Sequence, residues 1–104
     1  GGIDFWLEEI SIDVKCSSRE DGPLIFDSEK SFAAKVAVLY GATDNPEILK
    51  LHGCIGRKAF FERAYKKDFG YGERFVMGAD SLDPIEKLWR FYVEKNLVIT
   101  KEFA

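Results

Sequence analysis

The chain has 104 residues, of which 46% are hydrophobic and 32% charged, and its formal net charge is −3. This length supports one domain with a single core, and the composition excludes a disordered chain. No apolar run reaches the roughly 20 residues that cross a bilayer, and no segment resembles a secretion signal. We therefore expect residues 1–104 to form a single domain with no membrane partner. Because the only methionine is Met77, we expect Gly1 and Gly2 to be a cloning scar, a processed end or the cut edge of a longer protein.

The charge distribution and the number of cysteines bear on the expected binding surface and cellular compartment. Residues 1–34 carry eight acids against three bases, whereas residues 57–76 carry six bases against three acids. Such asymmetry can mark a binding face, although charge runs more often only solvate a surface. Cys16 and Cys54 are too few for a disulfide framework, so we expect reduced, mostly buried thiols in a cytoplasmic protein. A bridge would need their strands to be neighbours.

The first predicted strand spans residues 5–16 and has one wet face. Its apolar positions alternate with polar ones, as the period of two in a strand requires: Ile10, Ile12, Val14 and Cys16 against Glu9, Ser11, Asp13 and Lys15. Residues 17–23 form a polar loop that ends in a Gly-Pro turn signal. Residues 24–26 predict a short strand that covers an edge.

Residues 31–40 allow two interpretations. Asp27 or Ser28 could cap a helix, and three alanines favour one. We predict a strand instead, because residues 36–40 are rich in β-forming side chains and Gly41 ends the run. A turn at residues 43–46 precedes a third strand at 47–52, which the glycines in residues 53–56 break or bulge.

The next segments are a short helix and a strand. Residues 57–67 fit either type, but apolar residues four apart favour a helix. Residues 69–72 alternate aromatic residues with glycine and predict a flexible connection. Residues 74–77 predict a strand that ends at Gly78, and residues 97–100 predict a terminal edge strand.

A helix over residues 82–96 is the best-specified element. Asp83 is a suitable N-cap, Pro84 occupies the first helical position, and Glu86 completes a capping box. An apolar stripe at helical spacing predicts the core-facing side: Ile85, Leu88, Trp89 and Tyr92. Asn96 can end the helix in the left-handed conformation.

These elements predict an α+β fold. It would be a mainly antiparallel sheet of four or five strands, with one long C-terminal helix packed on one face. The single late helix leaves no β-α-β alternation, which argues against a doubly wound nucleotide-binding fold.

The sequence predicts no catalytic residue, metal site or cofactor. His52 and Cys54 would share one face of a strand, but a zinc site needs three or four protein ligands and no further cluster exists. No third group or oxyanion hole completes a nucleophile–base pair. Gly70 and Gly72 lack the third glycine of a dinucleotide fingerprint.

Residues 57–67 and the aromatics that follow are the candidate binding surface. Bases interleaved with aromatics can neutralise phosphates and stack on unpaired bases, whereas a purely structural element would bury Phe60 and Phe61. The predicted partner-binding residues are Arg57, Arg63, Tyr65, Lys66, Lys67, Phe69 and Tyr71.

Our leading hypothesis is a small, acidic, non-enzymatic binding domain that docks on another protein, as inhibitor, immunity or accessory proteins do. One alternative is a single-stranded nucleic-acid binder that uses residues 57–67. The other is a small enzyme centred on His52.

Overall fold

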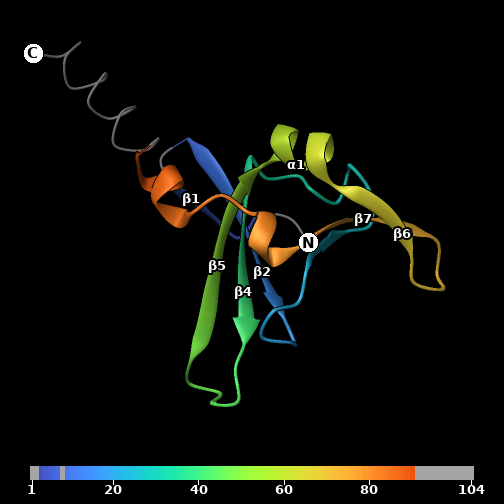
Figure 1. Ribbon diagram of the computed structural model, residues 1–104. Coiled ribbons are helices and arrows are strands. Elements are labelled where there is room, and N and C mark those ends of the chain that lie inside the picture. The colour runs from blue at the N-terminus through green and yellow to red at the C-terminus, as the bar shows by residue number, and fades with distance from the viewer. Residues whose placement is uncertain (1–2, 8, 91–104) are drawn as a thin grey trace, which may run out of the picture.

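The computed structural model describes residues 3–7 and 9–90, which form two β-sheets and three short helical segments (Figure 1). The first sheet has the order β1 (Phe5–Leu7), β2 (Ile10–Ser17), β4 (Val36–Ala42), β5 (Leu49–Gly56). The second sheet has the order β3 (Leu24–Phe26), β7 (Glu73–Met77), β6 (Tyr65–Asp68). The helical segments are α1 (Arg57–Arg63), the 3₁₀ turn η1 (Ala79–Ser81) and residues 85–90. The fold is therefore α+β, as the sequence predicts.

One hydrophobic cluster joins the two sheets and α1. It combines side chains from β3, β4, β5, β7 and α1 with Phe32 of the loop before β4: Leu24, Phe26, Phe32, Ala37, Leu39, Ile55, Phe60 and Met77. The Phe26 ring centroid lies 4.3 Å from that of Phe32 and 5.3 Å from that of Phe60. Large aromatic rings thus supply much of the apolar area that a small domain must bury.

A second cluster covers the opposite face of the first sheet. Its buried members come from β2, β4 and β5: Ile10, Ile12, Val38 and Cys54. Ile85 and Leu88, from the helical residues 85–90, pack against it. The first sheet is therefore covered on both faces at the end where β5 meets α1.

The helix predicted over residues 82–96 is shown only at residues 85–90, because residue 91 and those beyond lie outside the described part. Ile85 and Leu88 face the core as predicted, but Trp89 is 60% exposed, so its assignment to the core is wrong. The Asp83 carboxylate lies 3.0 Å from Lys87 Nζ and also pairs with Arg63 Nη2. Asp83 therefore pairs with cations rather than completing a capping box with Glu86.

The residues predicted to form a single strand, 5–16, form a β1–β2 hairpin. The prediction of which side chains of this strand face solvent is also wrong. Ser11 and Asp13 are buried, at 7% and 1% exposure, whereas Val14 and Cys16 are exposed. β2 lies inside its sheet, between β1 and β4. Each of its faces meets a packed layer near its start, so alternation alone does not decide which side chains reach water.

The prediction of a single sheet is also wrong, although four of the five strand pairs in the described residues are antiparallel, as predicted. β2 and β4 pair in parallel, with Ile12 opposite Val36 and Ser17 opposite Gly41. β3 lies between these two strands in the sequence but joins the other sheet, where Phe26 pairs with Phe75. Because the chain crosses to the second layer and returns, β4 re-enters the first sheet in the same direction as β2.

Several helices and strands begin or end at residues other than those predicted. Residues 31–35 form a turn and loop, β4 starts at Val36, and it continues through Gly41 to Ala42. β5 runs through the glycine-rich residues to Gly56, with a register shift that leaves His52 as a bulge. The helix predicted in residues 57–67 is α1, but β6 follows it unpredicted. The strand at 74–77 is β7, and the predicted strand at 97–100 lies outside the described residues.

Candidate functional site

The β6–β7 hairpin, residues 65–77, carries most of the predicted binding residues. Its strands pair antiparallel, with Tyr65 opposite Val76 and Asp68 opposite Glu73. The Asp68 carboxylate closes the turn, because its Oδ1 accepts hydrogen bonds from the N–H groups of Gly70 at 2.7 Å and Gly72 at 3.2 Å. Both glycines have positive φ, near 105° and 109°, which other residues adopt rarely. This turn fixes the positions from which the intervening aromatic residues project.

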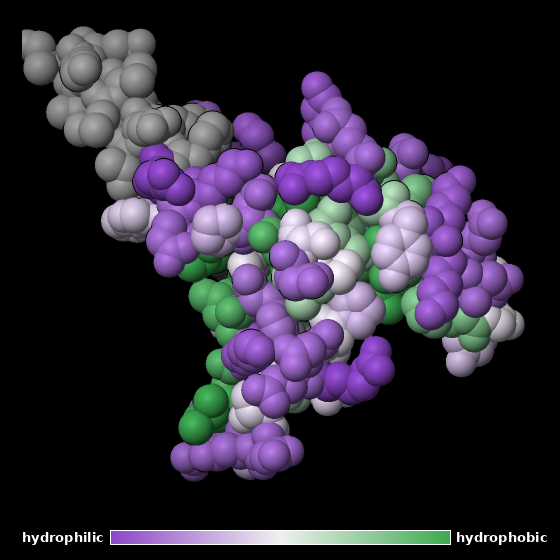
Figure 2. Space-filling view, in the orientation of Figure 1, coloured by the Kyte–Doolittle hydropathy of each residue, from purple (hydrophilic) through white to green (hydrophobic). Residues whose placement is uncertain are grey.

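Three aromatic side chains of this hairpin face solvent. Tyr65 is 56% exposed, Phe69 38% and Tyr71 81%. Lys67 Nζ lies 5.0 Å from the Phe69 ring centroid, and the Arg74 guanidinium lies 5.7 Å from that of Tyr71. Cations at these distances attract the ring faces and hold the side chains against each other. In Figure 2, the end of the molecule that the hairpin forms has hydrophilic residues mixed with residues of intermediate or high hydropathy.

Phe75 and Arg74 of the hairpin contact the body of the domain. Lys66 Nζ lies 5.5 Å from the ring centroid of Phe75, which packs on the first cluster. Arg74 pairs with Asp27, in the loop after β3. Arg74 was not among the predicted binding residues, because only the strand register places it beside Lys67 and near Tyr71.

Arg57 and Arg63 lie apart from the hairpin, on α1. Arg57 donates from Nε to the Phe32 carbonyl at 2.8 Å and from Nη2 to the Glu29 carbonyl at 2.9 Å. Arg63 Nη2 lies 3.4 Å from Asp83 Oδ2. These arginines hold loops against α1, so the structure brings together five of the seven predicted residues: Tyr65, Lys66, Lys67, Phe69 and Tyr71.

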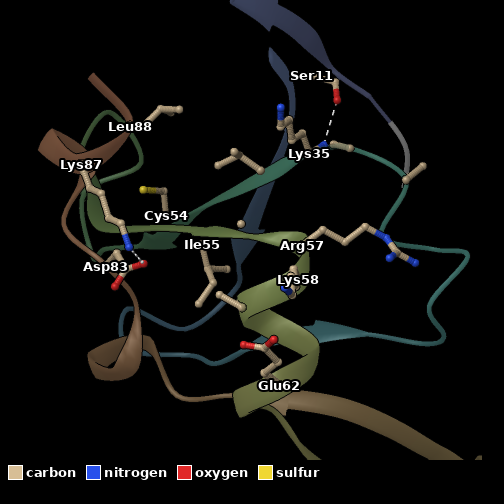
Figure 3. A pocket seen from close by; sticks show the side chains of 15 residues that line it. Ser11, Lys35, Cys54, Ile55, Arg57, Lys58, Glu62, Asp83, Lys87 and Leu88 are labelled. Carbon is tan, nitrogen blue, oxygen red and sulfur yellow. Dashed lines mark hydrogen bonds and ion pairs between the residues drawn. The ribbon is translucent and has the colours of Figure 1, made fainter. Parts of the chain in front are cut away.

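A cleft of about 720 Å³ opens beside α1 (Figure 3). Its walls come from residues 33–36, the end of β5, α1 and residues 83–88. Because these segments are far apart in sequence, no local sequence motif predicts the cleft. Apolar lining residues include Val36, Ile55 and Leu88. In Figure 3 the Arg57 side chain extends away from Glu62 toward the loop before β4, and Lys87 turns to Asp83. Two of the cations near the cleft are thus already engaged within the protein.

His52 and Cys54 do not form a pair. The His52 ring contacts the Glu20 carbonyl above Gly41, whereas the Cys54 thiol lies in the second cluster and donates to the Pro84 carbonyl at 3.5 Å. The bulge at His52 shifts the register, so the shared face expected of residues two apart is lost. Burial raises the pKa of the Cys54 thiol above its usual value, which opposes formation of a thiolate.

Among residues 3–7 and 9–90, no group of three or more His, Cys, Asp or Glu side chains could hold a metal ion. No helix in this part of the chain has the length and apolarity needed to span a bilayer. The chain has no significant match among family models, curated protein sequences or solved structures.

Proposed function

We propose that this chain is a non-enzymatic binding domain that docks on another protein through the β6–β7 hairpin. The observation that carries the proposal is the exposure of Tyr65, Phe69 and Tyr71 on one hairpin, with Lys67 and Arg74 against two of the rings. Tyrosine and arginine are enriched among the residues that dominate binding energy at protein interfaces. Rings already held by cations lose little further freedom when a partner covers them.

Charge supports a partner with an acidic surface. The hairpin carries three cations, Lys66, Lys67 and Arg74, against the two carboxylates of Asp68 and Glu73, whereas the whole chain carries −3. The Asp68 carboxylate is occupied by two backbone N–H groups. Because Arg74 pairs with Asp27, the steering charge is that of Lys66 and Lys67, which would attract an acidic partner to the hairpin of this otherwise acidic protein.

The proposal places the protein in the cytoplasm, where both thiols would stay reduced. Cys16 and Cys54 are free, and their strands, β2 and β5, are separated by β4. The two strands are therefore not neighbours, and an intramolecular bridge plays no part in the proposal.

The test compares three forms of the protein as baits: wild type, the double variant Tyr65→Ala/Tyr71→Ala, and Trp6→Ala. Trp6 is the matched control, because it is a 60% exposed aromatic residue on β1, in the other sheet. A protein partner should be retained by wild type and by Trp6→Ala. With the purified partner, the double variant should bind at least about tenfold more weakly, as loss of interface hot spots does.

Retention of the same partner by all three baits at equal affinity would refute docking through the hairpin. Stacked aromatics and cations also suit single-stranded nucleic acid. A fluorescent single-stranded oligonucleotide therefore serves as the second probe. Binding to it that falls steeply with salt, together with no protein partner, would replace our proposal with nucleic-acid recognition.

A further inference from the structure

β6 is an edge strand of the second sheet. In the described residues it pairs only with β7, and all four of its residues are exposed. Figure 1 shows it at the end of the molecule away from residues 85–90. The free side of such a strand presents backbone N–H and C=O groups that can pair with a further strand.

The other sheet edges are short or partly bridged. Along β5, Cys54 and Asp83 exchange two backbone hydrogen bonds of 2.9 Å, so a second segment bridges this edge at one residue, while the exposed residues 49–51 lie outside that bridge. β3 and β1 have only three residues each, and both end residues of β3 are buried. β6 has no such bridge in the described residues and lies in the hairpin proposed to dock, so its edge is the one that we assign to a partner.

The side chains of β6 select the charge of that partner. Lys66 and Lys67 are consecutive, so they project to opposite faces of the sheet. Lys66 is held near Phe75 and Lys67 near Phe69, which keeps one cation beside the strand on each face. Lysines on an edge repel an identical strand, so a second copy of β6 is disfavoured. An incoming strand with carboxylates on both faces would instead pair with both cations.

We infer that β6 receives an extended, acidic segment of the partner protein, which adds to the second sheet as a fourth strand. This inference rests on the docking function proposed above. The added segment would pair along residues 65–68, place carboxylates near Lys66 and Lys67, and pass Tyr65 on the face it shares with Lys67. Backbone pairing would supply affinity, and the two lysines would supply the preference for acidic sequences.

The probe is a library of random eight-residue peptides displayed on phage and selected on the full chain. The selected peptides should be rich in Asp and Glu and should lack proline at their centre. In Lys66→Glu/Lys67→Glu their affinity should fall at least tenfold, whereas the matched control Lys66→Arg/Lys67→Arg should stay within about twofold of wild type. Enrichment of basic or uncharged peptides, or of none, would overturn the inference.

Amide hydrogen exchange separates strand addition from side-chain contact. When a selected peptide binds, outward-facing amides among residues 65–68 should exchange at least tenfold more slowly. Peptides that need Tyr65 and Tyr71 but leave these amides unprotected would refute strand addition while leaving docking through the hairpin intact. Sedimentation should show a monomer at micromolar concentration, and a dimer whose formation slows exchange of the amides of residues 65–68 would show that a second copy takes the edge instead.

Discussion

The backbone carbonyl of Asp83 occupies the space that a Cβ atom on Gly53 would need. Gly53 also has a φ of 148°, which side chains with a Cβ rarely adopt. Through this close approach the neighbouring Cys54 and Asp83 exchange two backbone hydrogen bonds. A glycine in β5 thus allows the segment before residues 85–90 to bridge the edge of the first sheet at Cys54.

Gly53→Ala should therefore lower the free energy of unfolding by about 2 kcal/mol or more, because both the backbone conformation and the contact with Asp83 become unfavourable. Urea denaturation measures the loss. Gly56→Ala is the matched control at the end of the same strand, since the nearest atom to its added Cβ is the Lys35 carbonyl oxygen at 3.9 Å. Equal midpoints for the two variants would contradict the close approach.

Leu88→Ala should cost more stability than Trp89→Ala, although tryptophan is the larger residue. Leu88 is half-buried against the second cluster, and its truncation should cost about 1–3 kcal/mol. Trp89 is 60% exposed, so its truncation should cost less than about 1 kcal/mol. Chemical denaturation of both variants decides the order, and a larger loss for Trp89→Ala would contradict the orientation of residues 85–90.

Ionisation of the buried Asp13 carboxyl should lower the free energy of unfolding as pH rises. Burial raises its pKa above the usual 3.8, even though Lys15 Nζ lies 3.5 Å away and favours the charged form. The folded state therefore binds the Asp13 proton more tightly than the unfolded state. Its contribution is fully present below pH 3.8 and is lost as pH rises through the raised pKa.

The Asp13→Asn variant has no carboxyl to ionise at this position. Its free energy of unfolding relative to wild type should therefore rise between pH 3.5 and pH 7. Denaturation midpoints across that range measure the change. Asp44→Asn, in an exposed turn, is the control and should follow the wild type. The opposite trend for Asp13→Asn would mean that the pair with Lys15 outweighs burial.

The two thiols should react at very different rates. Cys16 is exposed, whereas Cys54 is buried and has a raised pKa, so only Cys16 should react promptly with a thiol reagent in the native protein. Both should react after unfolding without prior reduction. Cys16→Ser should abolish the prompt reaction, and a prompt signal that persists in this variant would show that Cys54 is accessible.

The sequence predicts elements whose signals are local. The structure contains the helix α1 predicted from apolar residues four apart, the strand β7 predicted from its β-forming residues, and the apolar stripe of Ile85 and Leu88. The glycine turn that exposes Tyr71 is local as well, because Asp68 contacts it within four residues.

The packing of the two sheets and the helical segments on each other depends on residues far apart in sequence. The alternation in β2 is real, but burial of Asp13 depends on which element lies over each face of the sheet. The parallel pairing of β2 with β4 depends on where β3 goes, and β3 finds its partner about 50 residues later. Likewise the bulge at His52, which separates it from Cys54, arises from pairing with β4. The cleft beside α1 has the same origin, since its walls meet only after folding.

The distance along the chain between β3 and β7 sets an order for folding during synthesis. β1, β2, β4 and β5 are complete once Gly56 has left the ribosome, so the first sheet can form early. β3 must wait until Met77 emerges, because Leu24 pairs with Met77 and Phe26 with Phe75. Until then the Phe26 and Phe32 rings lack the layer that encloses them, and the nascent chain carries an open aromatic surface. That interval is when this protein is most prone to aggregate or to engage a chaperone.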